Sequence, residues 1–184
     1  MRLKEKYEKE VVPKMMEKFG YKNRMAVPKI EKVVLNCGFG RLVSGKTKEE
    51  KEKVYQQIME ELALISGQKP ILTRAKESIS GFNIKKGEPV GAKVTLRRKR
   101  MYDFLERLIW IALPRLRDFK GIDKKWFDEK GNLNIGIKEQ IAFPEISPEK
   151  TKFIFGLQAT IVTNAKNKEE AIELFKLMGF PIKE

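Results

Sequence analysis

The chain has 184 residues, of which 41% are hydrophobic, and it carries a formal net charge of +14. This length suits one domain with a buried core, and the hydrophobic content excludes a disordered chain. The charge favours an anionic partner, either a nucleic acid or a membrane surface. The single cysteine, Cys37, excludes an intrachain disulfide and favours a reducing compartment.

Targeting and membrane signals are absent from the sequence. The N-terminal stretch MRLKEKYEKE lacks the apolar core of a signal peptide, and the longest apolar run, residues 108–113, is far too short to span a bilayer. We therefore expect a cytosolic protein with no membrane partner.

The first half of the chain is expected to contain, in order, helix 3–18, strand 29–38, helix 47–66, strand 70–75 and strand 90–97. The first helix has apolar residues four apart and a predicted break at Pro13. The second helix has a capping box, because Thr47 can cap it and Glu50 follows three residues later. A long polar loop over residues 76–89 joins the last two strands.

The second half is expected to contain helix 101–113, an irregular segment over residues 118–148, strand 153–163 and a final helix. The irregular segment has turn signals and prolines, and leaves room for one short strand. The final helix is expected to begin near Asn167, with Glu170 at its capping-box position, and to end at Gly179.

This order of elements predicts an α+β fold. It corresponds to a ferredoxin-like, split β-α-β arrangement, in which an antiparallel sheet has its helices packed on one face. No linker divides the chain, so residues 1–184 form a single domain with an N-terminal helix and a long basic loop. The other face of the sheet is left open.

Alternation along the strands predicts which side chains occupy the open face. If Val94 and Leu96 point to the helices, then Lys93, Thr95 and Arg97 point outward. The same rule places further residues outward on the first and last strands: Lys32, Val34, Asn36, Gln158 and Thr160. The open face is therefore polar and mildly basic.

Basic residues are concentrated in one segment. Between Lys69 and Arg100 there are ten basic residues and only two acidic ones. Such clustering indicates a nucleic acid, since it would neutralise phosphates. Apart from Phe82 in the loop, this surface has no aromatic ring for stacking unpaired bases, and no helix is both basic and free for a DNA major groove. Structured RNA, read from its wide minor groove, is the favoured partner.

One motif points to a different function. Residues 40–47, GRLVSGKT, match the phosphate-loop pattern G-x-x-x-x-G-K-[ST], after a strand and before a helix. In that interpretation Lys46 would reach the terminal phosphates and Thr47 would hold magnesium. None of the four aspartates ends an apolar strand, as metal binding would require, and the sheet is expected to be antiparallel. Thr47 is more simply a helix cap, so nucleotide hydrolysis is the less favoured alternative.

Other catalytic chemistry is poorly represented. The chain has no histidine, the usual general base and zinc ligand. Glu139 and Glu145 could be paired carboxylates, but a structural turn is favoured there, and Cys37 on an apolar strand is interpreted as a core residue. We expect no enzyme activity, no metal and no cofactor. A protein–protein scaffold is a third alternative.

Long motifs resemble one known family. They are LNCGFG, ISGQKPILTRAKESISGFNIKKGEPVGAKVTLR, MYDFLERLIWIALPRLRDFKG and FDEKGNLNIGIKEQIAFPEI. They are similar, over nearly the whole chain, to the bacterial form of the fifth protein of the large ribosomal subunit, which binds 5S rRNA. The resemblance implies an α+β sheet backed by helices, a place in the cytoplasmic ribosome, and no catalysis.

The resemblance also implies partners and site residues. The open sheet face would bind a helix of 5S rRNA in the central protuberance, and the matching motifs carry over Asn36, Gln68, Thr95 and Arg97 as rRNA-binding residues. Lys69, Thr73 and Lys93 complete the expected rRNA-binding set. The loop would reach large-subunit rRNA and P-site tRNA through Lys76, Ser78, Ser80, Phe82, Asn83, Lys85 and Lys86. Further implied partners are neighbouring proteins of the central protuberance and a small-subunit protein across the subunit bridge.

The chain departs from the family pattern at three places. RRKR at residues 97–100 is more basic than the usual Arg-Gly-Glu-Arg, Glu129 replaces the usual Gly in FDEKGN, and the stretch that contains GRLVSGKT is longer than in relatives. A position in a variable insertion favours coincidence as the origin of the phosphate-loop match.

Overall fold

A five-stranded antiparallel sheet forms the centre of the molecule in the computed structural model, which describes residues 2–117, 119–149 and 151–183. The strands are β1 (Ile30–Gly38), β2 (Ile71–Arg74), β3 (Pro89–Leu96), β4 (Leu133–Ile137) and β5 (Leu157–Thr163), in the spatial order β2-β3-β1-β5-β4. β3 lies between β1 and β2 and runs antiparallel to both, which is the expected split β-α-β arrangement. The predicted α+β class is confirmed.

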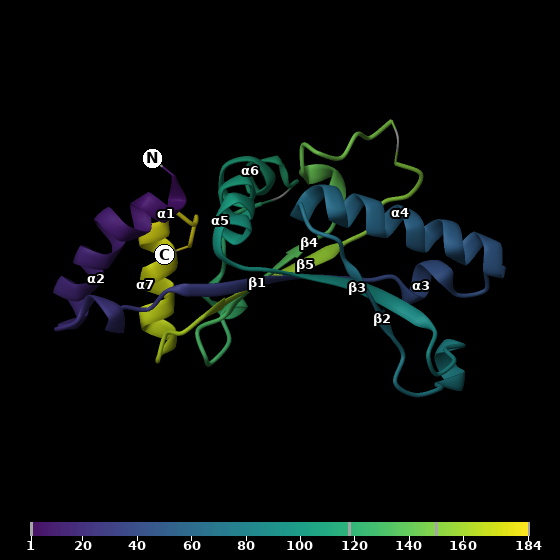
Figure 1. Ribbon diagram of the computed structural model, residues 1–184, viewed down its shortest axis with the longest axis horizontal. Coiled ribbons are helices and arrows are strands. Elements are labelled where there is room, and N and C mark those ends of the chain that lie inside the picture. Colours follow the sequence, from purple (N-terminus) through teal and green to yellow (C-terminus); the bar gives the residue numbers. More distant parts are fainter. Residues whose placement is uncertain (1, 118, 150, 184) are drawn as a thin grey trace.

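The helices cover one face of the sheet (Figure 1). α5 (Arg98–Arg107) and α6 (Leu113–Arg115) lie over its middle, and α4 (Lys48–Ser66) lies over the end that holds β2 and β3, where α3 (Gly40–Val43) precedes it. α1 (Leu3–Lys6), α2 (Val12–Phe19) and α7 (Lys168–Met178) gather at one end.

The core lies between this helical layer and the sheet. Inward side chains such as Leu35, Leu96 and Ile161 are fully buried, as are Leu62 of α4 and Phe104 of α5. Each such side chain contributes about 1.5–3 kcal/mol through removal of apolar surface from water. Alternate residues on each strand are thereby fixed toward the helices, and their neighbours toward solvent.

The predicted break at Pro13 is wrong, because the N-terminal helix continues through it. A π-helical turn, Tyr7–Val11, precedes Pro13, and a second one, Leu108–Ala112, precedes Pro114 in the long helical segment after β3. A proline ring clashes with the carbonyl four residues earlier, and in both cases that residue lies inside the π turn. The wider turn accommodates the ring, so the helix continues without a break.

The last strand begins later than expected. Residues 153–156 lie outside β5, because the backbone of Phe155 is bound by the buried side chain and backbone of Gln140. The backbone amide of Phe155 donates to the side-chain oxygen Oε1 of Gln140 at 2.9 Å, and the backbone amide of Gln140 donates to the Phe155 carbonyl at 3.2 Å. Gln140 Nε2 also donates to Glu61 of α4 at 3.1 Å. The apolar alternation of residues 153–156 predicts a strand. It could not reveal that the Gln140 side chain, rather than a neighbouring strand, forms hydrogen bonds with this backbone.

Element ends agree only in part with the expected ones. Thr47 and Glu50 form the predicted capping box of α4. Asn167 occupies the cap position of α7, but its side chain makes no capping hydrogen bond; Glu170 instead accepts one from the Lys166 amide. The segment over residues 118–148, expected to be irregular with room for one short strand, contains β4 as that strand. The expected loop 76–89 loses its last residue to β3, and the helix expected at residue 101 begins at Arg98.

Cys37 is expected to be unreactive in the folded protein. Its side chain is fully buried on β1, and burial raises the pKa of its thiol to about 12. Because the thiolate is the reacting species, an aromatic disulfide reagent near neutral pH should modify the chain only after denaturation. Thiol titration with and without guanidinium measures this, and rapid labelling of the native protein would contradict the burial.

Candidate nucleic-acid interface

Two rows of mostly polar side chains cross the open face of the sheet. In the first row, Asn36 of β1 is paired with Lys93 of β3 on one side and with Gln158 of β5 on the other. All three are exposed. In the second row, Val34 is paired with Thr95 and Thr160, and these three are half-buried. The rows present amide, hydroxyl and ammonium groups side by side on one surface.

β4 extends this surface with a residue that the sequence analysis missed. Asn134 is paired with Thr160, and its Oδ1 accepts hydrogen bonds from Thr160 Oγ1 at 2.8 Å and from Gln158 Nε2 at 3.3 Å. These bonds fix the amide orientation of Asn134. The signal that could have found it is the alternation of Leu133, Ile135 and Ile137, which are buried.

Gln68 lies beside the sheet, just after α4. Its Nε2 donates to the Thr95 carbonyl at 3.2 Å, and its Oε1 accepts from Arg100 Nη1 at 3.3 Å. The Ser66 hydroxyl donates to its carbonyl at 2.9 Å. These contacts hold the amide next to β3, with donor and acceptor capacity left for a ligand. Arg100 was not among the predicted site residues.

The remaining predicted sheet residues are also accessible. Arg97 lies just after β3, which ends at Leu96 rather than at the predicted residue 97. It occupies the N-cap position of α5 with extended backbone (φ −138°, ψ 161°) and no side-chain capping hydrogen bond, and its side chain is exposed. Lys69 is exposed and Thr73 half-buried on the β2 side. Among the described residues no cation of the open face takes part in an ion pair, so its positive charge is not neutralised within the chain.

The segment between β2 and β3 is a hairpin with its own hydrogen bonds. The Ile79 amide donates to the Ile84 carbonyl at 2.9 Å, and the Lys86 amide donates to Ser78 Oγ at 2.9 Å. Phe82 at its tip is 70% exposed. Of the predicted residues there, Ser78 thus has a structural role, while the following side chains are exposed: Lys76, Ser80, Asn83, Lys85 and Lys86.

An ion pair attaches the base of this hairpin to α4. Lys51 Nζ lies 2.5 Å from Glu88 Oε1, and the hydrogen bond from Lys51 holds the pKa of the Glu88 carboxyl below its ordinary value. The same bond raises the pKa of Lys51. The basic segment has two acidic residues, Glu77 and Glu88. Lys51 neutralises the charge of Glu88.

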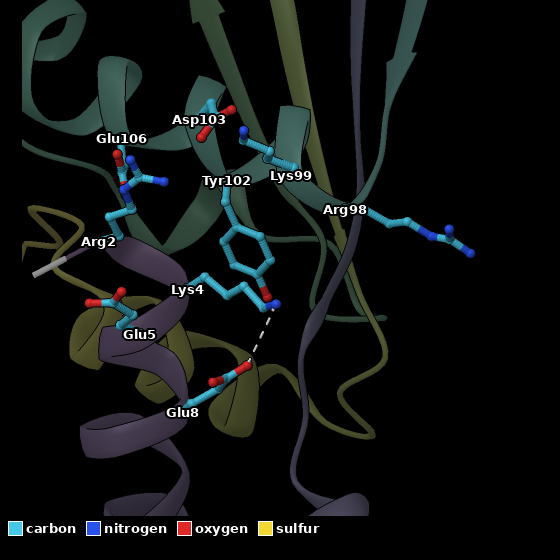
Figure 2. A pocket seen from close by; sticks show the side chains of 9 residues that line it. All are labelled: Arg2, Lys4, Glu5, Glu8, Arg98, Lys99, Tyr102, Asp103 and Glu106. Carbon is cyan, nitrogen blue, oxygen red and sulfur yellow. Dashed lines mark ion pairs between the residues drawn. The ribbon is translucent and has the colours of Figure 1, made fainter.

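The pocket between α1 and α5 is balanced in charge (Figure 2). Its lining includes four cations and four carboxylates: Arg2, Lys4, Arg98, Lys99, Glu5, Glu8, Asp103 and Glu106. Lys4 pairs with Glu8 at 3.9 Å, and the Arg98 side chain points away from the others. A balanced cluster of this kind gives no net attraction for a polyanion, in contrast with the open face.

GRLVSGKT does not form a phosphate loop. Gly40–Val43 is a helical turn, with Val43 buried in the core. Thr47 Oγ1 accepts from the Glu50 amide at 3.4 Å and donates to the Glu50 carboxylate at 3.0 Å, so its hydroxyl is used in capping. The Gly40–Val43 backbone is therefore used in a helical turn and the Thr47 hydroxyl in helix capping, so neither is arranged to hold nucleotide phosphates.

The paired-carboxylate alternative is not supported, because Glu145 is ion-paired with Arg107, which also donates to the Ile65 carbonyl at 2.9 Å. Within the described ranges, no three His, Cys, Asp or Glu side chains are grouped to bind a metal ion.

In the part of the chain that the structure describes, every helix lacks the length or the apolar character to cross a bilayer.

Comparison with known proteins shows to which class of protein the chain belongs. A family model described as ribosomal protein L5 matches residues 23–85, and a second model, described as the C-terminus of the same ribosomal family, matches residues 89–182. Proteins named large ribosomal subunit protein uL5 are similar over full length. That of Caldanaerobacter subterraneus subsp. tengcongensis is 55% identical over 98% of this chain and 97% of its own. That of Geotalea daltonii is 52% identical, over 99% and 98%.

Fold, open face and family models together define the class: a ribosomal protein, structural rather than catalytic. The chain belongs to the ribosomal protein L5 family. It is therefore a structural protein of the large subunit, and its place is the cytoplasmic ribosome.

Proposed function

We propose that the chain binds a helix of 5S rRNA in the central protuberance of the large subunit, through the open face of its sheet. The observation that carries the proposal is the row Lys93–Asn36–Gln158, a strip of exposed polar side chains on a surface without aromatic rings among its described residues. Such a surface suits the wide, shallow minor groove of A-form RNA, where ribose hydroxyls and phosphates are accessible.

Each predicted residue takes a role from its chemistry and position. Arg97, exposed just after β3, binds a phosphate or a base edge, and Asn36 and Gln68 hydrogen-bond to groove edges or sugars. Thr95, half-buried in the second row, fits against a ribose. The remaining members of the set contact the sugar–phosphate backbone: Lys69, Thr73 and Lys93.

The hairpin extends the proposed interface beyond the sheet. Its exposed lysines and Phe82 would contact large-subunit rRNA and P-site tRNA. Residues 1–184 would then act as one RNA-binding domain. Neighbouring proteins of the central protuberance and a small-subunit protein across the subunit bridge complete the proposed partners.

Replacing Arg97 by alanine is expected to weaken 5S rRNA binding by about 1–3 kcal/mol, because a bidentate contact is lost. Arg97→Lys should recover only part of this, since an ammonium keeps the charge but not the fork geometry. Filter-binding titrations measure both.

The matched control is Arg24→Ala, which removes the same charge from a side chain bound to the N-terminal helix. Unchanged affinity of the Arg97 variant would refute its role. The proposed function as a whole is tested by the RNA that copurifies with the chain from its native cell: 5S rRNA is expected, and its absence would overturn the proposal.

A further inference from the structure

A second pocket joins two segments that are 40 residues apart in the sequence. It has a volume of about 580 Å³ and lies between the α3 segment and the tip of the hairpin. Arg41 and Ser44 line it from the first segment, and Phe82 and Asn83 line it from the second. The pocket therefore takes in part of GRLVSGKT, but neither Lys46 nor Thr47 is among its lining residues.

Glycines keep this pocket open. Gly38, Gly40 and Gly81 line it, and a Cβ added at any of the three would meet no atom within 4 Å. None of them has a backbone conformation restricted to glycine. Packing within the chain thus does not require these glycines, and side chains here would occupy space that a ligand could use.

The polar and aromatic groups around the pocket match the parts of a nucleotide. The Phe82 ring is 70% exposed, and an exposed ring is a stacking platform for an unpaired base. The Arg41 guanidinium is exposed and suits a phosphate, while Ser44 and Asn83 offer hydrogen-bonding groups for base edges or ribose. The volume lies within the range of about 300–1,000 Å³ that small-ligand pockets have.

Charge around the pocket favours a nucleotide that belongs to a polyanion. The hairpin carries Lys76, Lys85 and Lys86 against Glu77, and its Glu88 is neutralised by Lys51. The Gly40–Val43 segment forms a helical turn, so it offers no phosphate loop for the terminal phosphates of a free nucleoside triphosphate.

We propose that this pocket binds a single unpaired nucleotide of RNA, with its base stacked on Phe82 and its phosphate on Arg41. This inference rests on the proposed RNA-binding function. The sheet face binds an RNA duplex, whereas the pocket binds one unpaired base from a loop or a bulge. The protein then recognises two kinds of RNA structure with two separate surfaces.

The test uses the full chain and a short single-stranded oligoribonucleotide with a fluorescent base, beside the 5S rRNA titration. Phe82→Ala should weaken oligonucleotide binding by about fivefold or more, as the loss of one stacked base implies. Phe82→Leu should lose as much, because it keeps the apolar volume but not the ring. Gly40→Leu should have the same effect by filling the pocket, with thermal melting confirming an unchanged fold.

Lys46→Ala is the matched control for Arg41→Ala, since it removes one charge from the same motif outside the pocket. Only the Arg41 variant should bind the oligonucleotide more weakly, and all pocket variants should bind 5S rRNA as the parent does. Equal oligonucleotide binding by the parent and the Phe82 variants would overturn the proposal that the pocket binds a nucleotide, and would leave the proposed function intact.

Two further outcomes would also overturn the proposed binding of an RNA nucleotide in the pocket. One is that the parent binds neither RNA, in which case the proposed function fails as well. The other is that ATP with magnesium competes for the pocket in a Lys46-dependent manner, which would instead indicate a nucleotide site.

Discussion

Raising the salt concentration from about 50 to about 200 mM is expected to weaken 5S rRNA binding by about 10²-fold, if four phosphates are engaged. Four accessible cations lie on the open face or beside it: Lys32, Lys69, Lys93 and Arg97. Each phosphate contact releases condensed counterions, so log affinity falls linearly with log salt, at a slope of about −4 for four contacts. Filter-binding titrations over a series of salt concentrations give the slope.

The charges that produce this slope can be identified by removing them in groups. A triple alanine variant of Lys69, Lys93 and Arg97 should reduce the slope by about three, one for each lost contact. The same number of exposed lysines removed from the N-terminal helix, Lys4, Lys9 and Lys14, should leave it unchanged. A flat salt dependence of the parent would show that phosphate contacts do not drive the binding.

Gly91→Ala is expected to destabilise the protein by about 1–3 kcal/mol, because it overpacks the sheet between β2 and β1. A Cβ at Gly91 would lie 2.6 Å from Thr73 Oγ1 and 2.9 Å from the Cys37 carbonyl oxygen. The carbonyl belongs to the backbone of the central strand and cannot turn aside. For a chain of this size, Tm should fall by about 2–4 °C for each kcal/mol, as thermal denaturation would measure.

Gly38 provides the control, since it is paired with Gly91 across β1 and β3, and a Cβ there would meet nothing within 4 Å. Gly38→Ala should therefore leave Tm nearly unchanged. Adding Thr73→Ala to Gly91→Ala should recover part of the loss, because only the side-chain clash is relieved. Equal melting temperatures for the Gly91 and Gly38 variants would refute the steric argument.

The open face could be predicted because strand geometry is local. Side chains on a strand alternate between two faces, so once Val94 and Leu96 were assigned to the core, Lys93 and Thr95 had to point outward. The structure has this alternation on β1, β3 and β5. The capping box of α4 was predictable for the same reason, since all its contacts lie within four residues of Thr47.

Features that depend on distant contacts could not be predicted. Gln140 binds the backbone of Phe155 and the Glu61 carboxylate, and this shortens β5. The π-helical turns before the two prolines have no signal in apolar periodicity, which instead predicted a break at Pro13. Asn134 joined the interface only because β4 forms the sheet edge next to β5.

By itself, the sequence determined the fold class, the polar character of the open face and the concentration of positive charge between Lys69 and Arg100. Each of these follows from the spacing of residue types along the chain, which strand and helix geometry converts directly into surfaces. Only the tertiary structure decided that Arg41 and Phe82 share a pocket and that Gln68 lies beside Thr95. Such neighbours are set by packing of the core and by strand order, so their proximity depends on the whole chain rather than on local pattern.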